Sequence, residues 1–383
     1  MYTRSIALPD RSFFLFGPRG TGKTTWLRAA LPKARWFDLL RSSEYLRLLR
    51  SPASFRAEVA AMTGPAWIVV DEVQKLPLLL DEVHSLLNEF GTRYRFALTG
   101  SSARKLKRGD VNLLAGRAIN RKLFPLTARE LDYDFDLDDL CRHGALPAIR
   151  AEEAGRVDYL EAYAANYLKE EVQQEALARS LDSFTRFLEV AALSNAQVTS
   201  VAGIARDAGV ARPTVQGYFS VLEDTLLGSW LPAWRPRAKI KEVAHPKFYF
   251  FDPGVTRALA GRLREPLDSA ERGHLLETLV LNELRAAIAY SGCGGELSYW
   301  RTPSGTEVDF VWARARTSVG IEVKSSPRWR PDDGRALETL VQARKLKRAF
   351  LVYTGDRELK AGPVRVLPYA RFTRLLSEGA ILD

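Results

Sequence analysis

Short apolar runs alternate with longer amphipathic stretches through the first third of the chain. Five runs have the length and composition of strands: 12–16, 35–39, 66–70, 95–99 and 119–123. Segments of helical periodicity separate them. This alternation favours a parallel sheet with helices on both faces.

The middle of the chain has a different pattern. From about residue 157 to residue 227, apolar residues recur at helical spacing with few glycines, and a proline-rich segment, 231–246, ends this region. An acid-rich stretch, 132–139, precedes it and is predicted to be a connector. We therefore expect a largely helical middle part.

Strand character returns after a long helical stretch, 270–290. Five apolar runs follow, at 297–301, 307–311, 318–324, 349–353 and 364–367. One helix, at about 333–345, interrupts them. The whole pattern predicts an α/β protein with three domains, 1–131, 132–255 and 256–383.

A glycine-rich turn lies between the first strand and the first helix. Its sequence, GPRGTGKT, fits G-x-x-x-x-G-K-[ST]. Glycines let backbone N–H groups turn around phosphates, and the helix N-terminus adds its positive dipole end. We expect ATP to be bound by Gly17, Pro18, Arg19, Gly20, Thr21, Gly22, Lys23, Thr24 and Thr25. Lys23 is expected to hold the β- and γ-phosphate oxygens, and the Thr24 hydroxyl to ligate Mg²⁺. A glycine-rich turn without a ligand is the alternative.

Two acids, Asp71 and Glu72, end the apolar run 66–70. Asp71 can hold Mg²⁺ directly or through water, and Glu72 can polarise the attacking water as the catalytic base. Asp-Glu after a strand is also a common helix N-cap. The phosphate-loop sequence upstream favours the metal and water roles.

Polar residues end the fourth strand, and an arginine follows downstream. Thr99 and Ser101 are expected beside the two earlier motifs, where either side chain can bind the γ-phosphate or the water. Arg117 is a candidate for stabilising transition-state charge, in cis or from a neighbouring subunit; a surface arginine is the alternative.

The segment 198–227 has the pattern of two short helices around a turn. Gly209 lies in the predicted turn, and Pro213 suits the first turn of the second helix. The predicted shared core is Ile204, Ala205, Val210, Val215, Tyr218 and Leu222. This is the pattern of a helix-turn-helix, winged by strands within 230–251. In a DNA-binding protein, Arg212, Thr214 and Gln216 would face the major groove. A lid on an ATPase or a protein-docking unit is the alternative.

Three charged residues stand out on two strands of the last part. Residues two apart on a strand face the same side, so Glu322 and Lys324 point together, away from Ile321 and Val323. Asp309 joins them if the two strands are neighbours, and Glu277 or Glu283 on the preceding helix adds a carboxylate. Hard oxygen ligands make an Mg²⁺ site, and Lys324 would orient water or stabilise charge on phosphorus.

Asp309, Glu322 and Lys324 are therefore candidate catalytic residues of metal-assisted phosphodiester hydrolysis, with Glu283, Asp309 and Glu322 as metal ligands. A surface strand of alternating charge is the alternative.

The net charge and the cysteine content indicate which partners and which cellular compartment to expect. The net charge of +10 favours a polyanionic partner or ligand, or is spread over a solvated surface. The two cysteines, Cys141 and Cys293, indicate neither a disulfide framework nor a zinc site. Neither a signal peptide nor a membrane span is predicted, so a cytoplasmic protein is the expectation.

The N-terminal motifs resemble those of AAA-type P-loop ATPases. GPRGTGKT, WIVVDEVQKLP and FALTGSS carry the resemblance over 12–131. LLAGRA followed by FPLTAREL is similar to a prokaryotic family of these ATPases that carries a C-terminal domain of unassigned function. That resemblance extends over nearly the whole chain, including the sequence GALP at 144–147.

The last part is similar to the PD-(D/E)xK nuclease superfamily. Its pattern maps onto Glu283 (or Glu277) on the helix, Asp309 on the second strand, and Glu322 and Lys324 on the third. This resemblance implies a restriction-endonuclease-like α/β fold for 256–383.

Three functions remain open. The first is an ATPase, with ATP and Mg²⁺ as cofactors, that couples nucleotide state to DNA binding and metal-dependent cleavage; RNA is the alternative substrate. The second is a nucleotide-switched DNA- or protein-binding module without cleavage. The third is a signalling or defence ATPase that senses a partner protein. A homo-oligomer is compatible with each.

Overall fold

The computed structural model describes residues 2–101, 114, 116–152, 154–167, 181–235 and 245–383. By its contacts the chain divides into two compact units. The phosphate-loop unit comprises Ile6–Phe124 and Asp224–Leu226; the large unit comprises Met1–Ser5, Pro125–Glu223 and Leu227–Asp383. The three-domain division stays a prediction.

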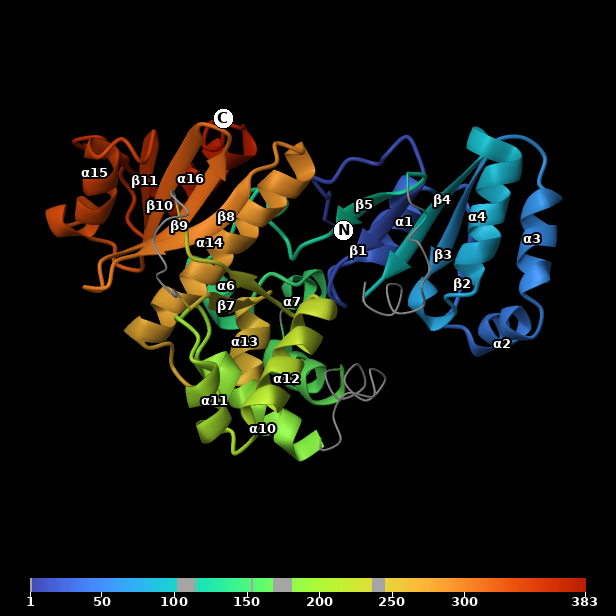
Figure 1. Cartoon of the computed structure of the whole chain (residues 1–383), viewed down its shortest axis with the longest axis horizontal. Helices are drawn as coiled ribbons and strands as arrows, with labels where there is room; N and C mark the ends of the chain where they lie inside the picture. Colours follow the sequence, from blue (N-terminus) through green and yellow to red (C-terminus); the bar gives the residue numbers. More distant parts are fainter. Residues whose placement is uncertain (1, 102–113, 115, 153, 168–180, 236–244) are drawn as a thin grey trace. The chain divides into compact units, whose positions relative to one another are not determined.

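The phosphate-loop unit contains the parallel sheet that the sequence predicts (Figure 1). Its strands are β1 (Phe13–Phe16), β2 (Arg35–Asp38), β3 (Ala66–Asp71), β4 (Tyr94–Gly100) and β5 (Ile119–Lys122). They lie in the order β2-β3-β4-β1-β5, and every neighbouring pair is parallel. The carboxyl ends of β1, β3 and β4, where the predicted motifs lie, therefore meet at one edge of the sheet.

Helices cover both faces of this sheet, as predicted. Strand alternation sends Phe14, Ile68 and Phe96 into one core with α2 (Ser42–Arg50), α3 (Pro52–Ala60) and α4 (Leu79–Phe90). The opposite face carries Phe13, whose ring contacts Trp26 of α1 (Lys23–Ala30). Short 3₁₀ turns, Val73–Lys75 and Gly91–Arg93, complete the unit.

The helical part of the large unit begins earlier than expected. The predicted connector, 132–139, already contains the start of α6 (Leu137–His143), because Asp136 accepts hydrogen bonds from the backbone N–H groups of Asp138 and Asp139. The other helices are α7 (Pro147–Ala151), α8 (Arg156–Ala162) with a π-turn at Tyr163–Tyr167, α10 (Leu181–Leu193) and α13 (Pro253–Leu259).

The predicted helix pair is present as α11 (Val201–Asp207) and α12 (Arg212–Asp224). Five of the six predicted core residues are buried in one cluster, and Val210 packs against it half-buried. Two antiparallel strands, β6 (Gly228–Leu231) and β7 (Lys247–Phe250), follow the helices.

A six-stranded sheet forms the last part of the large unit. Its strands are β8 (Glu296–Arg301), β9 (Glu307–Arg314), β10 (Thr317–Lys324), β11 (Arg348–Tyr353), β12 (Leu359–Ala361) and β13 (Val364–Pro368), in the order β12-β13-β11-β10-β9-β8. Strands β8, β9 and β10 form an antiparallel meander, and β11 runs parallel to β10 and β13.

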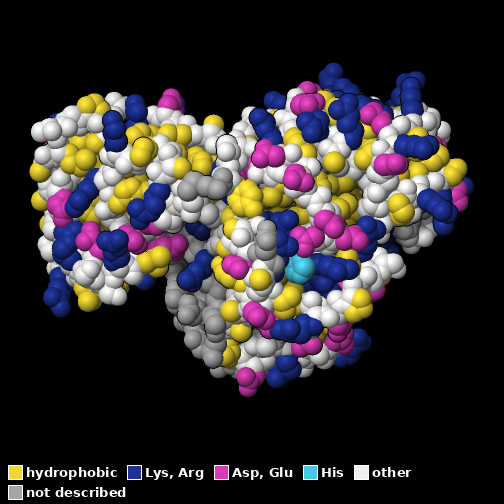
Figure 2. Space-filling view, turned by 180° about the vertical axis from the view of Figure 1, so that it is seen from behind, with side chains coloured by type: hydrophobic (Ala, Val, Ile, Leu, Met, Phe, Trp, Pro, Cys, Tyr) yellow, Lys and Arg dark blue, Asp and Glu magenta, His cyan; other side chains and the backbone are white. Residues whose placement is uncertain are grey.

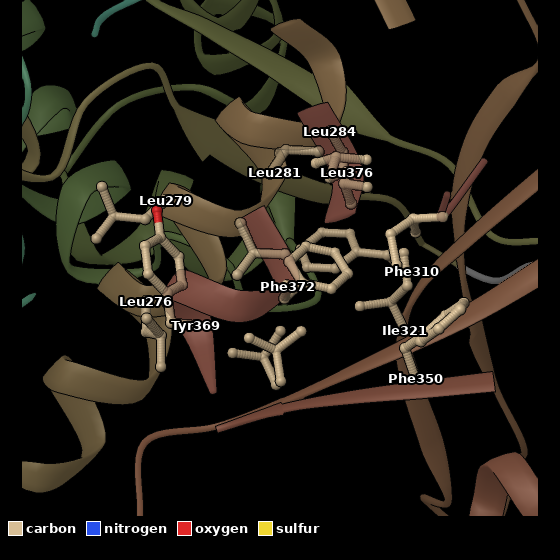
Figure 3. Packing of buried hydrophobic residues seen from close by; sticks show 14 of the residues in the cluster. Leu276, Leu279, Leu281, Leu284, Phe310, Ile321, Phe350, Tyr369, Phe372 and Leu376 are labelled. Atoms are coloured by element: carbon tan, nitrogen blue, oxygen red, sulfur yellow. The ribbon is translucent and has the colours of Figure 1, made fainter. Parts of the chain in front are cut away.

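Two helices cover one face of this sheet. Leucines of α14 (Ser269–Ser291) and aromatic residues of α16 (Tyr369–Ser377) pack against Phe310, Ile321 and Phe350 (Figure 3). The opposite face packs against α15 (Arg335–Gln342), which follows a 3₁₀ turn at Pro331–Gly334. The sequence pattern predicted α14, α15 and five of these strands but not the short β12 or α16.

The sequence GALP marks a close approach between α6 and α13. Asp252 caps α13 by accepting a hydrogen bond from the Val255 N–H and also accepts one from the Ala145 N–H at 2.7 Å. A Cβ on Gly144 would lie 1.9 Å from Asp252 Oδ1, and its φ is +76°. Only glycine fits there without displacing the cap.

We therefore predict that Gly144→Ala is more destabilising than a matched glycine replacement. Gly261 also has positive φ, at +69°, but a Cβ there meets nothing within 4 Å. Gly261→Ala should lower the free energy of unfolding by about 1 to 2 kcal/mol for the left-handed backbone. Gly144→Ala should lose about 1–3 kcal/mol more from the clash. Urea denaturation measures both; equal losses would contradict the close approach.

Candidate functional site

The phosphate loop has the backbone that its glycines predict. It connects β1, which ends at Phe16, to α1, which begins at Lys23. Gly20 and Gly22 have φ of +84° and +86°. A Cβ on Gly17 would lie 2.5 Å from the Leu123 carbonyl oxygen. The turn thus depends on glycine at three positions.

Lys23 is folded back onto this loop. Its Nζ donates hydrogen bonds to the carbonyl oxygens of Gly17 (2.6 Å) and Pro18 (3.1 Å), and the Thr21 hydroxyl donates to Pro18 at 2.7 Å. Lys23 is only 6% exposed. The ammonium is therefore held at the mouth of the loop, where phosphate oxygens can replace the carbonyl oxygens as its partners.

Asp71 connects two predicted residues, Thr24 and Thr99, at the sheet edge. The Thr24 hydroxyl donates to Asp71 Oδ2 at 2.9 Å, and the Thr99 hydroxyl donates to Asp71 Oδ1. Thr99 Oγ1 also accepts the Glu72 backbone N–H at 2.9 Å. A hydroxyl and a carboxylate in contact are oxygen donors of the kind that suits Mg²⁺, so these residues fit the metal of a bound nucleotide.

Glu72 lies in a left-handed conformation, with φ 60° and ψ 46°. Such backbone is costly for a residue other than glycine and clusters at functional sites. Glu72 occupies the N-cap position of the 3₁₀ turn, but its side chain makes no capping hydrogen bond. The helix-cap alternative therefore has no support from the side chain.

Gln74 is a site residue that the sequence analysis did not select. Its Nε2 donates to a Glu72 carboxylate oxygen and to Ser101 Oγ at 3.1 Å, and it is buried. Its Oε1 has no partner among the described residues. The position two residues after Glu72 was the available signal, although only the fold shows that Gln74 turns back toward β4.

Most of the remaining candidates of this region are exposed. Arg19 and Thr25 are exposed, and Pro18 is buried. Arg117 is exposed and its guanidinium contacts His84 of α4. Most of the segment before Arg117, including 102–113, lies outside the described residues. The role of Arg117 in charge stabilisation stays a prediction.

Asp309, Glu322 and Lys324 are neighbours in the large unit. Strands β9 and β10 pair up to Phe310–Ile321, and beyond this pair Asp309 Oδ2 accepts the Val323 backbone N–H at 2.8 Å. Lys324 Nζ donates to Glu322 Oε1 at 2.5 Å. Glu322 is 6% exposed, and its Oε2 has no partner among the described residues. A carboxylate oxygen of this kind is one that a divalent cation could satisfy.

A lysine from the helical part enters the same group of acids. Lys247 Nζ lies 3.3 Å from Glu277 Oε2 and 3.7 Å from Asp309 Oδ1, and it also contacts Glu307. The Tyr249 hydroxyl donates to Glu277 Oε2 at 2.8 Å. We call Glu277, Glu307, Asp309 and Glu322 the carboxylate cluster. Neither Lys247 nor Glu307 was selected as a site residue from the sequence.

Burial and mutual repulsion shift the pKa values within the cluster. Burial, together with Asp309, raises the pKa of Glu277 to about 8 and that of Glu322 well above its ordinary range. Burial opposes the charge of Lys247, but Glu277, Asp309 and Glu307 raise its pKa above the ordinary lysine value. The acids thus need a cation to be ionised together.

Glu283, the first choice for the helix carboxylate, lies elsewhere. It accepts the Ala128 N–H at 2.6 Å, and burial, with a smaller contribution from Glu130, raises its pKa. Glu277 and Glu283 are six residues apart on α14, which rotates their side chains onto different faces. The structure therefore favours the alternative, Glu277, as the helix carboxylate beside Asp309.

Open space lies on two sides of the cluster. A cleft of about 540 Å³ is lined by Glu307, Glu322, Lys324 and residues of α15, and one of about 310 Å³ by Lys247, Glu277 and Glu307. In the described part of the chain, no three Asp, Glu, His or Cys side chains are grouped so that they could hold a metal ion. The Lys247 ammonium lies among the acids instead.

Models of known protein families match three successive segments of the chain. Residues 9–132 match the model of an AAA domain, which supports an AAA-type ATPase in this region and agrees with the resemblance of its motifs. Residues 134–265 and 272–372 match two domains of unknown function, DUF8612 and DUF4143. Neither of these two matches assigns an activity to its part of the chain.

Individual relatives are distant. The uncharacterized protein Rv2008c of Mycobacterium tuberculosis is 28% identical over 353 residues, which cover 89% of this chain and 76% of that protein. The Aeropyrum pernix Orc1 protein in complex with DNA is 16% identical with a TM-score of 0.28, covering 67% of this chain and 87% of its own. For the Bacillus subtilis DNA clamp loader delta protein the values are 12%, 0.25, 55% and 83%. These TM-scores carry no conclusion about this chain.

Among the helices that the structure describes, none has the length and apolar character to span a bilayer.

The burial of Glu283 predicts a pH-dependent stability. Its pKa is raised to about 8 by burial, so the native state keeps a proton that the unfolded chain releases above about pH 4.5. Stability should fall as pH rises from about 4.5 to about 8, by at most about 1.4 kcal/mol per pH unit from this group.

Glu283→Gln removes that contribution, because a neutral amide oxygen can still accept the Ala128 N–H. The advantage of Glu283→Gln over the wild type should therefore grow between pH 5 and pH 8 in urea denaturation, whereas exposed Glu378→Gln should show no such trend. A pH-independent difference for Glu283→Gln would show that this carboxyl is not protonated in the native state.

Proposed function

We propose that this chain is an AAA-type ATPase that couples its nucleotide state to nucleic-acid binding and to Mg²⁺-dependent phosphodiester cleavage in the large unit. The observation that carries the ATPase proposal is the set of hydrogen bonds that links Thr24, Asp71 and Thr99 beside the phosphate loop. Each side chain is held before any ligand binds, which reduces the reorganisation that binding requires.

The residues of the loop divide the work of ATP hydrolysis. Lys23 and the N–H groups at the start of α1 would bind phosphate oxygens, and Thr24 and Asp71 would hold Mg²⁺, which neutralises developing charge. Glu72 would accept the proton of the attacking water. Gln74, which contacts both Glu72 and Ser101, would fix the direction of the Glu72 carboxylate.

Nucleic acid is the partner that the helix pair favours, with DNA as the first expectation. Arg212 and Gln216 are exposed at the start of α12, and Thr214 is half-buried between them. In the view of Figure 2, Lys and Arg side chains are scattered among Asp and Glu side chains rather than gathered in one patch. This face therefore presents no broad basic surface, and the nucleic-acid proposal rests on the exposed residues of the helix pair.

Cleavage is proposed on the carboxylate cluster. Asp309 and the orphaned Glu322 Oε2 would hold Mg²⁺, which activates a water molecule and stabilises charge on phosphorus. Lys324, half-exposed at the 540 Å³ cleft, would orient that water or bind the phosphate. These roles are those of the nuclease resemblance, with Glu277 in place of Glu283.

One observation favours the second candidate, a nucleotide-switched binding module without cleavage. The Lys247 ammonium already pairs with Glu277, Glu307 and Asp309, so three of the four carboxylates have a cationic partner without a metal ion. If the Lys247 ion pairs are permanent, the large unit binds a partner but does not cut nucleic acid.

The ATPase proposal predicts that Glu72→Gln separates binding from hydrolysis. The amide cannot accept the proton of water, so kcat for ATP should fall by about 10²–10⁴ while ATP affinity stays within a few-fold. Phosphate release and calorimetry measure the two quantities, with exposed Lys33→Ala as the control. Unchanged turnover in Glu72→Gln would remove this residue as the base.

The cleavage proposal predicts that Asp309→Asn and Glu322→Gln abolish metal-dependent cleavage but leave ATP hydrolysis intact. Single- and double-stranded DNA and RNA are tested with Mg²⁺ or Mn²⁺, with and without ATP. Asp332→Asn, at an exposed acid of the same cleft, is the matched control and should retain activity.

Two results would count against cleavage. Activity that survives in Glu322→Gln would place it outside the cluster. A wild-type chain that cuts no substrate, yet binds nucleic acid with an ATP-dependent affinity, would favour the binding module. A chain that shows no salt-sensitive binding to nucleic acids, and that captures one partner protein, would favour the signalling ATPase.

A further inference from the structure

Lys247 belongs to strand β7, but the acids that surround its ammonium come from α14 and β9. It begins β7, whose partner β6 follows the helix pair α11–α12. Its Nζ nevertheless contacts Glu277 of α14 and Glu307 and Asp309 of β9. Lys247 is 3% exposed, so its charge is largely shielded from bulk water.

The position of Lys247 is fixed on several sides. Tyr249, two residues along the same face of β7, donates its hydroxyl to Glu277. The Tyr299 hydroxyl donates to the His245 carbonyl just before β7, and the Tyr299 ring lies 5.6 Å from Lys247 Nζ. The helix-pair segment is thus joined to the six-stranded sheet at the carboxylate cluster itself.

A buried ammonium and buried carboxylates depend on each other. Removing either ion from water is unfavourable, and only close opposite charges offset this cost. Four acids in one cluster repel one another unless a cation lies among them. In this structure Lys247 is the cation that contacts three of them, and Lys324 contacts the fourth, Glu322.

Asp309 is the residue on which two cations would converge. Its Oδ2 is engaged by the Val323 N–H, and its Oδ1 faces Lys247 at 3.7 Å. On the other side of Asp309, Glu322 Oε2 is buried and has no partner among the described residues. Asp309 and Glu322 would hold the divalent ion, and Asp309 already contacts Lys247, so the two cations would share one carboxylate.

We propose that the Lys247 ammonium and a divalent cation compete for the carboxylate cluster, so that metal binding there requires Lys247 to withdraw. This inference rests on the proposed metal site. It makes β7 a gate: the segment that follows the proposed nucleic-acid-binding helices decides whether the cluster holds a metal ion. Cleavage in the absence of a bound partner is thereby suppressed.

The test is the Mn²⁺ affinity of the nucleotide-free full-length chain, read from the electron paramagnetic resonance signal of free Mn²⁺. Lys247→Met should bind Mn²⁺ at least tenfold more tightly than the wild type. The gain should disappear in Lys247→Met/Asp309→Asn. Lys247→Arg, which keeps the cation, should stay close to the wild type.

A matched lysine separates competition from general electrostatics. Lys324 contacts Glu322 on the other side of the cluster, so Lys324→Met removes an equal charge nearby. It should raise Mn²⁺ affinity clearly less than Lys247→Met. Equal gains in the two variants, or a gain that survives Asp309→Asn, would overturn the proposal.

A second variant guards against misfolding. Lys247→Met/Glu277→Gln removes one charge of each sign, and the amide oxygen still accepts the Tyr249 hydroxyl. It should fold, as checked by circular dichroism, and keep a Mn²⁺ affinity above that of the wild type. No gain in this folded variant would also overturn the proposal.

The Mn²⁺ affinity, measured beside cleavage, distinguishes failure of the competition from failure of the proposed nuclease activity. Tighter Mn²⁺ binding without cleavage of any nucleic acid would sustain the competition and contradict the nuclease proposal. Wild type and Lys247→Met that bind Mn²⁺ equally well, with wild-type cleavage intact, would contradict only the competition.

Discussion

The hydrogen bonds of the Asp71 carboxylate are the interaction on which the phosphate-loop unit depends. They connect the end of β3 to Thr24 at the start of α1 and to Thr99 at the end of β4. Residues alternate between the two faces of a strand, so a shift of β3 by one position would turn Asp71 away from both threonines. The parallel register of β3 and β4, with Val70 opposite Leu98, is therefore as necessary to the site as the loop glycines.

The large unit also contains a largely buried carboxylate, Asp309, but stabilises it in a different way. Asp71 is stabilised by hydroxyl groups, whereas Asp309 is stabilised by a backbone N–H and a buried ammonium. Hydroxyls can remain in place when a metal ion arrives, because they are neutral. An ammonium repels the ion. The two sites thus differ: the proposed Mg²⁺ site beside the phosphate loop has neutral partners, whereas the carboxylate cluster already contains the Lys247 ammonium.

Local patterns predicted the elements that are long, periodic or bounded by glycine and proline. The five strands of the first sheet, the helix pair with its buried Val215 and Leu222, and the neighbouring positions of Asp309 and Glu322 all follow from spacing. The short β12 and the start of α6 were missed, because three residues carry little periodicity and acid-rich sequence does not resemble a helix until Asp136 is recognised as its cap.

The site residues that sequence did not identify are those fixed by long-range packing. Lys247 is 30 residues from Glu277 and 62 from Asp309, and no spacing rule connects them. The choice between Glu277 and Glu283 required the orientation of α14, which its apolar residues on several faces do not reveal. Gln74 was hidden for a smaller reason: its role depends on the left-handed turn at Glu72.

We expect the loop around Lys23 to bind the triphosphate of ATP, with Mg²⁺ held between Thr24 and Asp71. Calorimetric titration of the intact chain with ATP, in the presence and absence of Mg²⁺, measures this binding most directly. We expect saturable binding of ATP at one site. Mg²⁺ should strengthen this binding, Lys23→Ala should abolish it, and Asp71→Asn should remove its dependence on Mg²⁺. A wild-type chain that takes up no ATP, or a Lys23→Ala variant that binds it equally well, would contradict the account.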